Sequence, residues 1–427
     1  MKNLKSCLKV KTVKFRIPRY CVCPFCGIKQ RFKKEKEHYK IVKDINVDKE
    51  LILKIRIVYA KCLNPNCKKS CFRLPTPGIE KYQRATIRLI KESSNSLIDD
   101  LSTTRRVAKR LKRIFNTTGS KSTVDRWKHK LADKFDIKEI ISKLEFSGIL
   151  CLDEFKARAI KIYNLIATDA LKNRILYIHP LEFAKFKGAG TPPRGSIESG
   201  LWKLKELGIN PWAVIVDLLA AYPKQIRKVW PNVIIQYDHF HVMQVIFKYF
   251  KNAIIDFRRN LKEEIFKDYK RELWEKKWFL LSNMDNWSDS NHKEMQELIE
   301  VYQGTIIEEI LIFKEQIRLI LQEATSKEEA YYLRDELFKQ TFWRNSYHLT
   351  KIIQFLMSPK FEYMITYLEY PLVPRAGNSE TLIRTWRQME KVRYGFKTLK
   401  GQLDHLKLFQ INRYLNGEIY SLHENLF

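Results

Sequence analysis

Residues 148–155 read GILCLDEF, and residues 212–219 read WAVIVDLL. Each is a short run of apolar, partly β-branched residues with an aspartate near its carboxyl end, Asp153 in the first run and Asp217 in the second. That pattern is typical of a buried strand that delivers one polar side chain to the edge of a sheet. A buried carboxylate is costly unless it meets a positive charge, so the two aspartates predict a site for a hard divalent cation.

The segments around these runs predict one mixed sheet. Three apolar runs separated by turn-like residues come first, at residues 148–155, 161–170 and 173–180, and they indicate an antiparallel meander. A Gly/Pro loop at 187–196 and a helix follow, and the strand, helix, strand order of residues 212–241 then predicts a parallel crossover. This is the order of a ribonuclease-H-like sheet, in which the first and fourth strands are neighbours. Asp153 and Asp217 are therefore expected to meet.

Residues 242–370 contain few glycines or prolines and predict an all-helical insertion. A later helix carries Glu380, Arg384, Arg387 and Lys391 at spacings that place them on one face, and Gly395 ends it. An acid and three cations on one face suit a metal and adjacent phosphates. An ordinary salt-bridged surface helix is the alternative.

The charge of the chain indicates a polyanionic partner. The 427 residues carry a formal net charge of +31, and residues 1–150 hold 38 Lys+Arg against 14 Asp+Glu, a difference of +24. Nucleic acid is the usual partner of such a field. No stretch approaches the roughly 20 apolar residues that span a bilayer, so we expect a cytoplasmic protein associated with the nucleoid and not with a membrane.

Four cysteines form two short-spaced pairs, Cys23 with Cys26 and Cys62 with Cys67, each on a turn marked by Pro, Gly or Asn. Two such pairs predict a structural four-cysteine zinc site. Cys71 is an alternative to Cys67, and Cys21 adjoins the first pair. Unrelated reduced thiols are the simpler interpretation.

Residues 78–135 predict a helix-turn-helix. A first helix has an apolar stripe at Val107, Leu111 and Ile114, and a second begins at Ser122 or Thr123 after a turn at Gly119. In the second helix Val124 and Trp127 are expected to pack inward. Its exposed face would present to DNA the cations Lys121, Arg126 and Lys130. A plain basic helical hairpin is the alternative.

In the order of these parts the chain resembles the DDE transposases of the bacterial ISL-three insertion-sequence family. The shared motifs are the C-P-x-C-G module, the strand ending D-E-F (Asp153–Phe155), the strand ending Asp-Leu before a Tyr-Pro helix, the D-x-x-H of Asp238 and His241, and the late Asn-Ser-Glu before Y-G-F (Asn378–Phe396). The resemblance implies a catalytic triad of Asp153, Asp217 and Glu380 that holds two Mg²⁺ (or Mn²⁺) ions, with Asp238 and His241 in a supporting role. It also implies double-stranded DNA as substrate and a homo-oligomer.

Two other acids compete for these positions. Asp238 also ends an apolar strand and is a second candidate for the place given to Asp217. Glu154 adjoins Asp153, but neighbouring strand residues point to opposite faces. In the family a Gly often follows the catalytic Glu, where this chain has Thr381.

The sequence therefore predicts a multidomain α/β protein. The predicted parts are a zinc module (1–77), a helix-turn-helix domain (78–145), the first part of a ribonuclease-H-like core (146–241), a helical insertion (242–370) and the last part of the core (371–427). The expected function is cleavage and strand transfer at the ends of an insertion sequence. A non-catalytic DNA-binding regulator or inactive copy, and a nuclease that does not join ends, are the alternatives.

Overall fold

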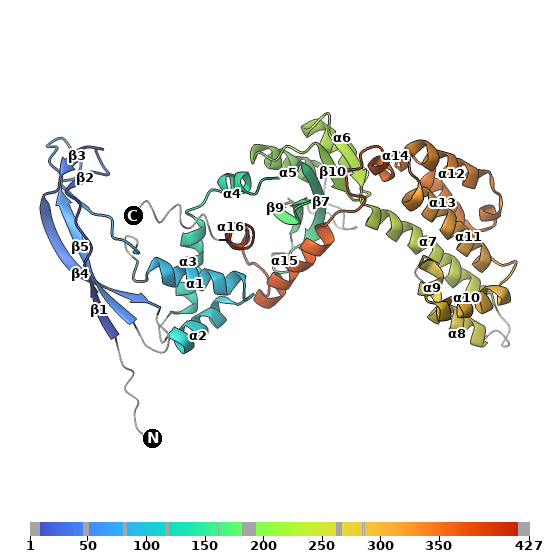
Figure 1. Cartoon of the computed structure of the whole chain (residues 1–427), viewed down its shortest axis with the longest axis horizontal. Helices are drawn as coiled ribbons and strands as arrows, with labels where there is room; N and C mark the ends of the chain where they lie inside the picture. The colour runs from blue at the N-terminus through green and yellow to red at the C-terminus, as the bar shows by residue number, and fades with distance from the viewer. Residues whose placement is uncertain are drawn as a thin grey trace, which may run out of the picture. The chain divides into compact units, whose positions relative to one another are not determined.

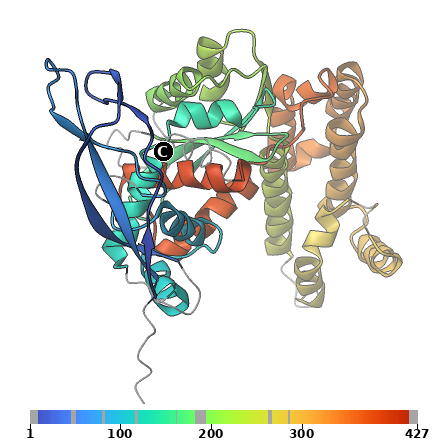
Figure 2. The ribbon, with the colours of Figure 1, turned by 60° about the vertical axis from the view of Figure 1, so that its left-hand side comes forward.

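The computed structural model describes residues 9–45, 51–79, 83–115, 119–160, 162–181, 194–261, 267–283, 285 and 287–416. The chain divides into two compact units, shown in Figures 1 and 2. The first comprises Met1–Glu145, Lys156–Ile162 and Arg384–Phe427, and the second comprises Phe146–Phe155 and Tyr163–Ile383. Each unit is described by itself.

The first unit opens with a small sheet built on two long strands, β4 (Lys34–Asp44) and β5 (Leu51–Lys61). Strand β1 (Lys9–Val13) runs parallel to β5, and β6 (Cys71–Arg73) pairs with its far end. Alternate residues of β5, among them Leu53, Ile55 and Ile57, bury one face against Val42 and Ile79. This period of two is what the sequence of β5 predicts.

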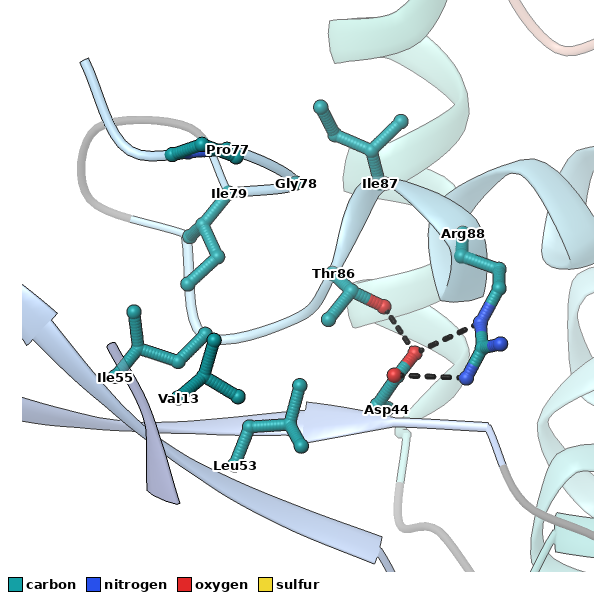
Figure 3. Close-up of a pocket in the computed structure, with 10 residues that line it drawn as sticks. All are labelled: Val13, Asp44, Leu53, Ile55, Pro77, Gly78, Ile79, Thr86, Ile87 and Arg88. Atoms are coloured by element: carbon teal, nitrogen blue, oxygen red, sulfur yellow. Dashed lines mark hydrogen bonds and ion pairs between the residues drawn. The ribbon is translucent and has the colours of Figure 1, made fainter. Parts of the chain in front are cut away.

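The sheet is joined to the first helix, α1 (Ile87–Ile98), by a buried polar contact. Thr86 caps α1 and also donates to Asp44 Oδ1 at 2.5 Å, while Arg88 Nη2 donates to Asp44 Oδ2 at 2.8 Å. These groups close one end of a mainly apolar cavity of about 390 Å³ (Figure 3). The pairing satisfies a buried carboxylate that would otherwise be costly.

Three further helices follow: α2 (Thr104–Phe115), α3 (Lys121–Ala132) and α4 (Ile137–Lys143). The expected helical pair is present, and Val124 and Trp127 are buried as predicted. The second helix begins at Lys121, slightly earlier than predicted, because Ser120 accepts from the Thr123 N–H and is the N-cap. Lys121, Arg126 and Lys130 are exposed.

The end of the chain completes this unit. The late helix α15 (Ser379–Arg393) ends as predicted, with Gly395 at φ +85° and its N–H donating to the Glu390 carbonyl at 2.7 Å. A Cβ at Gly395 would also lie 2.7 Å from the Ala159 backbone nitrogen. Helix α16 (Leu399–Tyr414) then packs on α3, where Lys400 Nζ lies 2.5 Å from Asp133.

The second unit contains a five-stranded sheet in the order β11-β10-β7-β8-β9. Its strands are β7 (Ile149–Lys156), β8 (Tyr163–Asp169), β9 (Arg174–Pro180), β10 (Ala213–Val216) and β11 (Ile234–Tyr237). β8 and β9 are antiparallel, whereas β10 is parallel to both β7 and β11. The predicted pairing of the first and fourth strands is confirmed. Residues 187–193 of the predicted Gly/Pro loop (187–196) lie outside the described residues.

Helices make up the rest of this unit. Helices α5 (Arg194–Glu206) and α6 (Ala221–Val229) occupy the two crossovers. The elements from residue 239 to 368 that the structure describes are all helical, as the sequence predicts: α7 (His239–Asn260), α8 (Lys267–Glu275), α9 (Lys277–Leu281), α10 (Asp289–Val301), α11 (Ile306–Arg318), η3 (Leu319–Glu323), α12 (Lys327–Lys339), η4 (Phe342–Asn345), α13 (Tyr347–Leu356), α14 (Phe361–Met364) and η5 (Thr366–Leu368). Among the described helices, none has the length and apolar character needed to cross a membrane.

Candidate active site and metal centre

Three aspartates lie level with one another across three adjacent parallel strands. Leu152 of β7 pairs with Val216 of β10, and Val216 pairs with Tyr237 of β11. Asp153 follows Leu152, Asp217 follows Val216, and Asp238 follows Tyr237. The sheet register therefore gathers three carboxylates at one edge, where the carboxyl ends of parallel strands meet.

Asp153 lies on β7, the middle strand of the five-stranded sheet. It is 8% exposed and accepts hydrogen bonds from the Glu154 N–H at 2.7 Å and from Ser379 Oγ at 3.1 Å. Burial, with a smaller contribution from the nearby Asp217 carboxylate, raises the pKa of Asp153 to about 6. A carboxylate that is costly to ionise in the protein alone is stabilised by a bound cation.

Asp217 follows β10 directly and is partly buried. Its Oδ1 accepts from the Leu219 N–H at 2.9 Å, which fixes the turn into α6. Burial raises the pKa of Asp217, while the positive fields of His241 and Lys360 act in the opposite direction.

Asp238 and His241 lie at the start of α7. Asp238 is 4% exposed and caps the helix by accepting from the Phe240 N–H at 2.9 Å, so it has a structural role of its own. Burial raises the pKa of Asp238 as well. His241 lowers the pKa of all three aspartates and is therefore their common neighbour.

The segment that leads to Glu380 is bound to the same edge of the sheet. Asn378 Nδ2 donates to the Asp169 carbonyl at 2.7 Å, and Asn378 Oδ1 accepts from Thr168 Oγ1 at 2.7 Å. A Cβ at Gly377 would lie 2.2 Å from Cys151 Sγ and 3.1 Å from Asp238 Oδ2. Glycine is therefore required there for the loop to approach the aspartates.

Glu380 itself is exposed in the first turn of α15, one residue beyond the Ser379 that contacts Asp153. Among the described residues, only the four cysteines form a group of three or more metal-ligating side chains whose ligand atoms all lie within 4.8 Å. The structure thus brings together Asp153, Asp217, Asp238 and His241, whereas Glu380 only follows the Ser379 that contacts Asp153. Arg384, Arg387 and Lys391 are exposed, as their spacing predicts.

Two features of this site escaped the sequence analysis. The carboxyl group of Glu154 accepts from the buried Tyr222 hydroxyl, and burial together with Asp217 raises its pKa to about 8. Lys360 donates from Nζ to the Leu218 carbonyl at 3.0 Å, beside Asp217. Tyr222 belongs to the Tyr-Pro pair noted in the sequence, whereas no local pattern marks Lys360.

The cysteine quartet Cys23, Cys26, Cys62 and Cys67 forms a second candidate site, within the first unit. The Sγ atoms of Cys23 and Cys67 are 3.8 Å apart, and those of Cys26 and Cys62 are 3.7 Å apart. Four thiolates at about 2.3 Å from one tetrahedral zinc would be about 3.8 Å from one another. The arrangement therefore fits a zinc ion.

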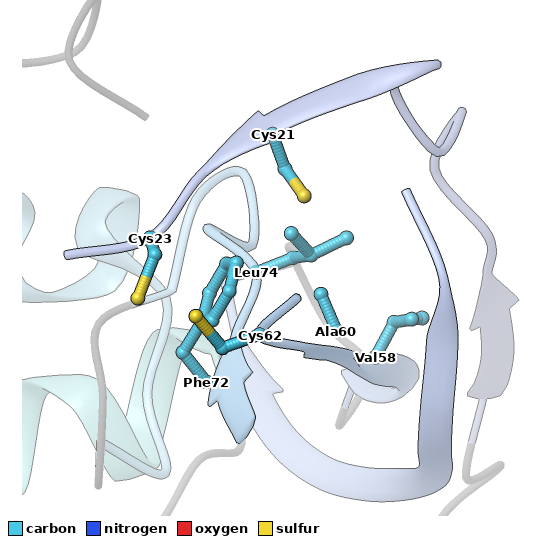
Figure 4. Packing of buried hydrophobic residues seen from close by; sticks show 7 residues of the cluster. All are labelled: Cys21, Cys23, Val58, Ala60, Cys62, Phe72 and Leu74. Atoms are coloured by element: carbon cyan, nitrogen blue, oxygen red, sulfur yellow. The ribbon is translucent and has the colours of Figure 1, made fainter. Parts of the chain in front are cut away.

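Local turns build this quartet. The Gly27 N–H donates to the Cys23 carbonyl at 2.9 Å, and the Cys67 N–H donates to the Asn64 carbonyl at 3.1 Å. A hydrogen bond from the Ile28 backbone lowers the pKa of Cys26 to about 7 and favours its thiolate. Cys21 packs with Val58 and Leu74 in an apolar cluster that also contains Cys23 and Cys62 (Figure 4). Neither Cys21 nor Cys71 belongs to the group of four ligands.

Comparison with known proteins shows similarity to transposases. A family model described as Transposase, of the ISL-three DDE type, matches residues 210–401. The chain is 26% identical over 230 residues to the transposase for insertion sequence element IS1001 of Bordetella parapertussis. That match covers 52% of this chain and 50% of the relative, so the chain spans about half the length of the curated relative it matches.

Among solved structures, the Drosophila P element transposase strand transfer complex matches at 16% identity over 81% of this chain and 82% of that chain, with a TM-score of 0.24. A TM-score this low does not establish a common fold. The two sequence matches instead confirm the predicted resemblance: the chain is similar to the DDE transposases of the ISL-three family. The matched segment contains Asp217, Asp238, His241 and Glu380, and Asp153 lies upstream of it.

Proposed function

We propose that the protein is a DNA transposase that binds the ends of an insertion sequence and catalyses metal-dependent cleavage and strand transfer. The observation that supports the proposal is the register of the sheet, in which Asp153 and Asp217 follow the paired residues Leu152 and Val216, in a chain similar to transposases over residues 210–401. Buried acids with raised pKa values at one edge are typical of a functional site.

Asp153, Asp217 and Glu380 would hold two Mg²⁺ or Mn²⁺ ions. Carboxylate oxygens are the ligands that these ions prefer, and the ions would supply Lewis-acid activation of water or a DNA 3′-hydroxyl and charge stabilisation at the phosphate. The chain itself orients the carboxylates that would bind the ions. Ser379 orients Asp153, and the Leu219 N–H orients Asp217.

Asp238 and His241 support this site. Asp238 and Asp217 each use one oxygen to accept a backbone N–H, so we keep Asp217 as the second ligand because it follows β10, the strand that pairs directly with β7. His241 lies on α7, a rigid element that holds it near the three aspartates. Glu380 would complete the ligand set by a change of its side-chain rotamer or of the first turn of α15.

The first unit would provide the docking surfaces. The quartet of cysteines would hold structural zinc and stabilise the small β module of residues 1–77. The helices of residues 78–145 would contact duplex DNA through Lys121, Arg126 and Lys130, and α15 through Arg384, Arg387 and Lys391. In this arrangement the ribonuclease-H-like core would comprise residues 146–241 and 371–427, of which Arg384–Phe427 belong to the first compact unit and the rest mainly to the second. The helical segment 242–370 is a candidate surface for a homo-oligomer that pairs two DNA ends.

A DNA-binding regulator or an inactive copy is the second candidate. The exposed position of Glu380, outside the group formed by Asp153, Asp217 and Asp238, favours it. A nuclease without joining activity shares the aspartates and differs only in the product.

Cleavage and joining of labelled duplex DNA from the two flanks of the coding region, with Mg²⁺ or Mn²⁺, tests the proposal. The wild type should nick at the end and join it to a target, while Asp217→Asn should bind the same DNA and do neither. Binding without cleavage by the wild type would favour the regulator, and cleavage without joining would favour the nuclease.

A further inference from the structure

Lys360 brings a positive charge from the helical segment 242–370 to the edge of the sheet where the aspartates lie. It stands between α13 and α14, and its Nζ donates to the Leu218 carbonyl at 3.0 Å. Leu218 directly follows Asp217, and the positive field of Lys360 acts on the Asp217 carboxylate. The two partners are far apart in the sequence, so the fold places this cation beside the acids.

The backbone on the carboxyl side of Lys360 is fixed to strand β11 by hydrogen bonds. The Gln236 side chain donates to the Met364 carbonyl at 3.1 Å and accepts from the Tyr367 N–H at 2.9 Å. Thr366 Oγ1 donates to a backbone carbonyl of the same strand at 2.9 Å. Gln236 and Thr366 are buried, so loss of these hydrogen bonds would leave unsatisfied polar groups in the interior. The segment that carries Lys360 therefore has a defined position on the sheet.

Aromatic contacts hold α14 in the same place. The ring of Tyr363 lies 5.2 Å from the ring of Tyr237, the last residue of β11, in an edge-on arrangement. The Arg227 guanidinium of α6 lies 5.5 Å from the centroid of the Tyr363 ring. Helix α14 thus contacts both β11 and α6, which adjoin the acidic edge, and Lys360 directly precedes this helix.

A lysine in this position disfavours a metal ion and favours an anion. A positive charge beside the aspartates repels any cation that they bind. An ammonium group has three N–H donors, and the Leu218 carbonyl accepts from one of them. Lys360 is partly exposed, so an anion can reach the group from solvent. Charge-assisted hydrogen bonds to phosphate oxygens are typical of such a lysine. Support of the turn after Asp217 is the simpler interpretation.

We propose that Lys360 binds an oxygen of a DNA phosphate at the acidic edge, so that the helical segment 242–370 contributes a residue to the active site. The inference rests on the proposed function, because it takes Asp153 and Asp217 as part of the site where DNA is cut. The ammonium would offset the repulsion between these acids and the phosphate, and it would stabilise negative charge that develops there during phosphoryl transfer. DNA is chosen as the anion because the net charge of +31 favours a polyanion.

The test compares Lys360→Gln with the matched control Lys205→Gln, both in the full chain. Lys205 also donates from Nζ to a backbone carbonyl, that of Val229 at 2.8 Å. Val229 ends α6 just before β11, so this contact lies where β11 begins and not at the acidic edge. Each variant loses one contact between a lysine and a carbonyl, and only Lys360→Gln removes a charge beside Asp217.

The first readouts are duplex binding and DNA cleavage. In Lys360→Gln the slope of log K against log salt should become shallower by about 0.9, the contribution of one phosphate contact, with Ca²⁺ in place of Mg²⁺. Cleavage with Mn²⁺ should slow at least about tenfold. Lys360→Arg keeps the charge and should keep the wild-type slope, and Lys205→Gln should keep both the slope and the rate. An unchanged slope in Lys360→Gln would overturn the inference.

Binding of Mn²⁺ without DNA separates a phosphate contact from support of Asp217. Loss of a positive charge beside the aspartates should leave the Mn²⁺ affinity of Lys360→Gln unchanged or higher, whereas displacement of Asp217 would lower it. Lower affinity would therefore overturn the inference. A wild type that binds duplex without cutting it, with the slope still reduced in Lys360→Gln, would contradict the proposed function and leave the phosphate contact standing. A wild type that binds no duplex would contradict both.

Discussion

The two candidate metal sites differ in how far their residues are separated along the chain. The cysteine quartet comes from two turns within residues 23–67, and its Sγ atoms already lie within 4.8 Å of one another. The acidic site draws Asp153, Asp217 and Glu380 from three elements spread over residues 149–393, and Glu380 remains exposed.

This difference is the one expected between a structural and a catalytic site. A closed set of four ligands leaves no position for a substrate, so a zinc ion held by the quartet would stabilise the fold. An incomplete set of buried acids keeps room for ions, water and a phosphate. Assembly from distant segments also lets the site depend on conformational change, which a structural site must avoid.

Removal of zinc should have the largest effect on stability. Substitution Cys23→Ser is expected to abolish zinc binding and unfold the β module around β5, because structural zinc supplies about 10–16 kcal/mol in small domains. Atomic absorption would measure the zinc content, and hydrogen exchange of residues 51–61 would measure the unfolding of the module. The control is Cys71→Ser, which should retain zinc. Equal loss in both variants would show that the quartet is not the ligand set.

Loss of an aspartate should have the largest effect on activity and little on the fold. Asp153→Asn is expected to lower the rate of DNA cleavage at least about a thousandfold, which corresponds to about 4 kcal/mol of lost transition-state stabilisation. Thermal unfolding should be unchanged or occur at higher temperature, because a buried carboxylate with a raised pKa is removed. Retained cleavage would remove Asp153 from the active site.

Gly377→Ala should have a smaller effect, on the geometry of the acidic site. The added Cβ would overlap Cys151 Sγ, so we expect a loss of about 1–3 kcal/mol in the free energy of unfolding, measured in urea. The double variant Gly377→Ala/Cys151→Ala removes the sulfur and should recover part of that loss. No recovery would mean that the strain arises elsewhere, for example against Asp238.

Several parts of this structure follow from the sequence because their causes are local. The two cysteine pairs, the apolar strands around Asp153 and Asp217 and the glycine end of α15 are short-range patterns, and the predicted strand order is observed. The start of α3 was predicted slightly late because Ser120, rather than a later residue, caps it.

The remaining parts depend on contacts between distant residues. Lys360 reaches the Leu218 carbonyl across 142 positions, and Tyr222 reaches Glu154 across 68. No spacing within the sequence encodes such contacts. The contact of Ser379 with Asp153 is also between distant residues. It depends on the pairing of β7 with β10 and on the close approach of the loop at Gly377 to Cys151 of β7.

Direct binding of Mn²⁺ tests the central claim, that the aspartates around His241 form the catalytic metal site. Electron paramagnetic resonance titration of the full chain with Mn²⁺ should show bound ions in the wild type and in Cys71→Ser, and weaker or no binding in Asp217→Asn. Wild-type Mn²⁺ binding by Asp217→Asn and by Asp153→Asn would contradict the claim.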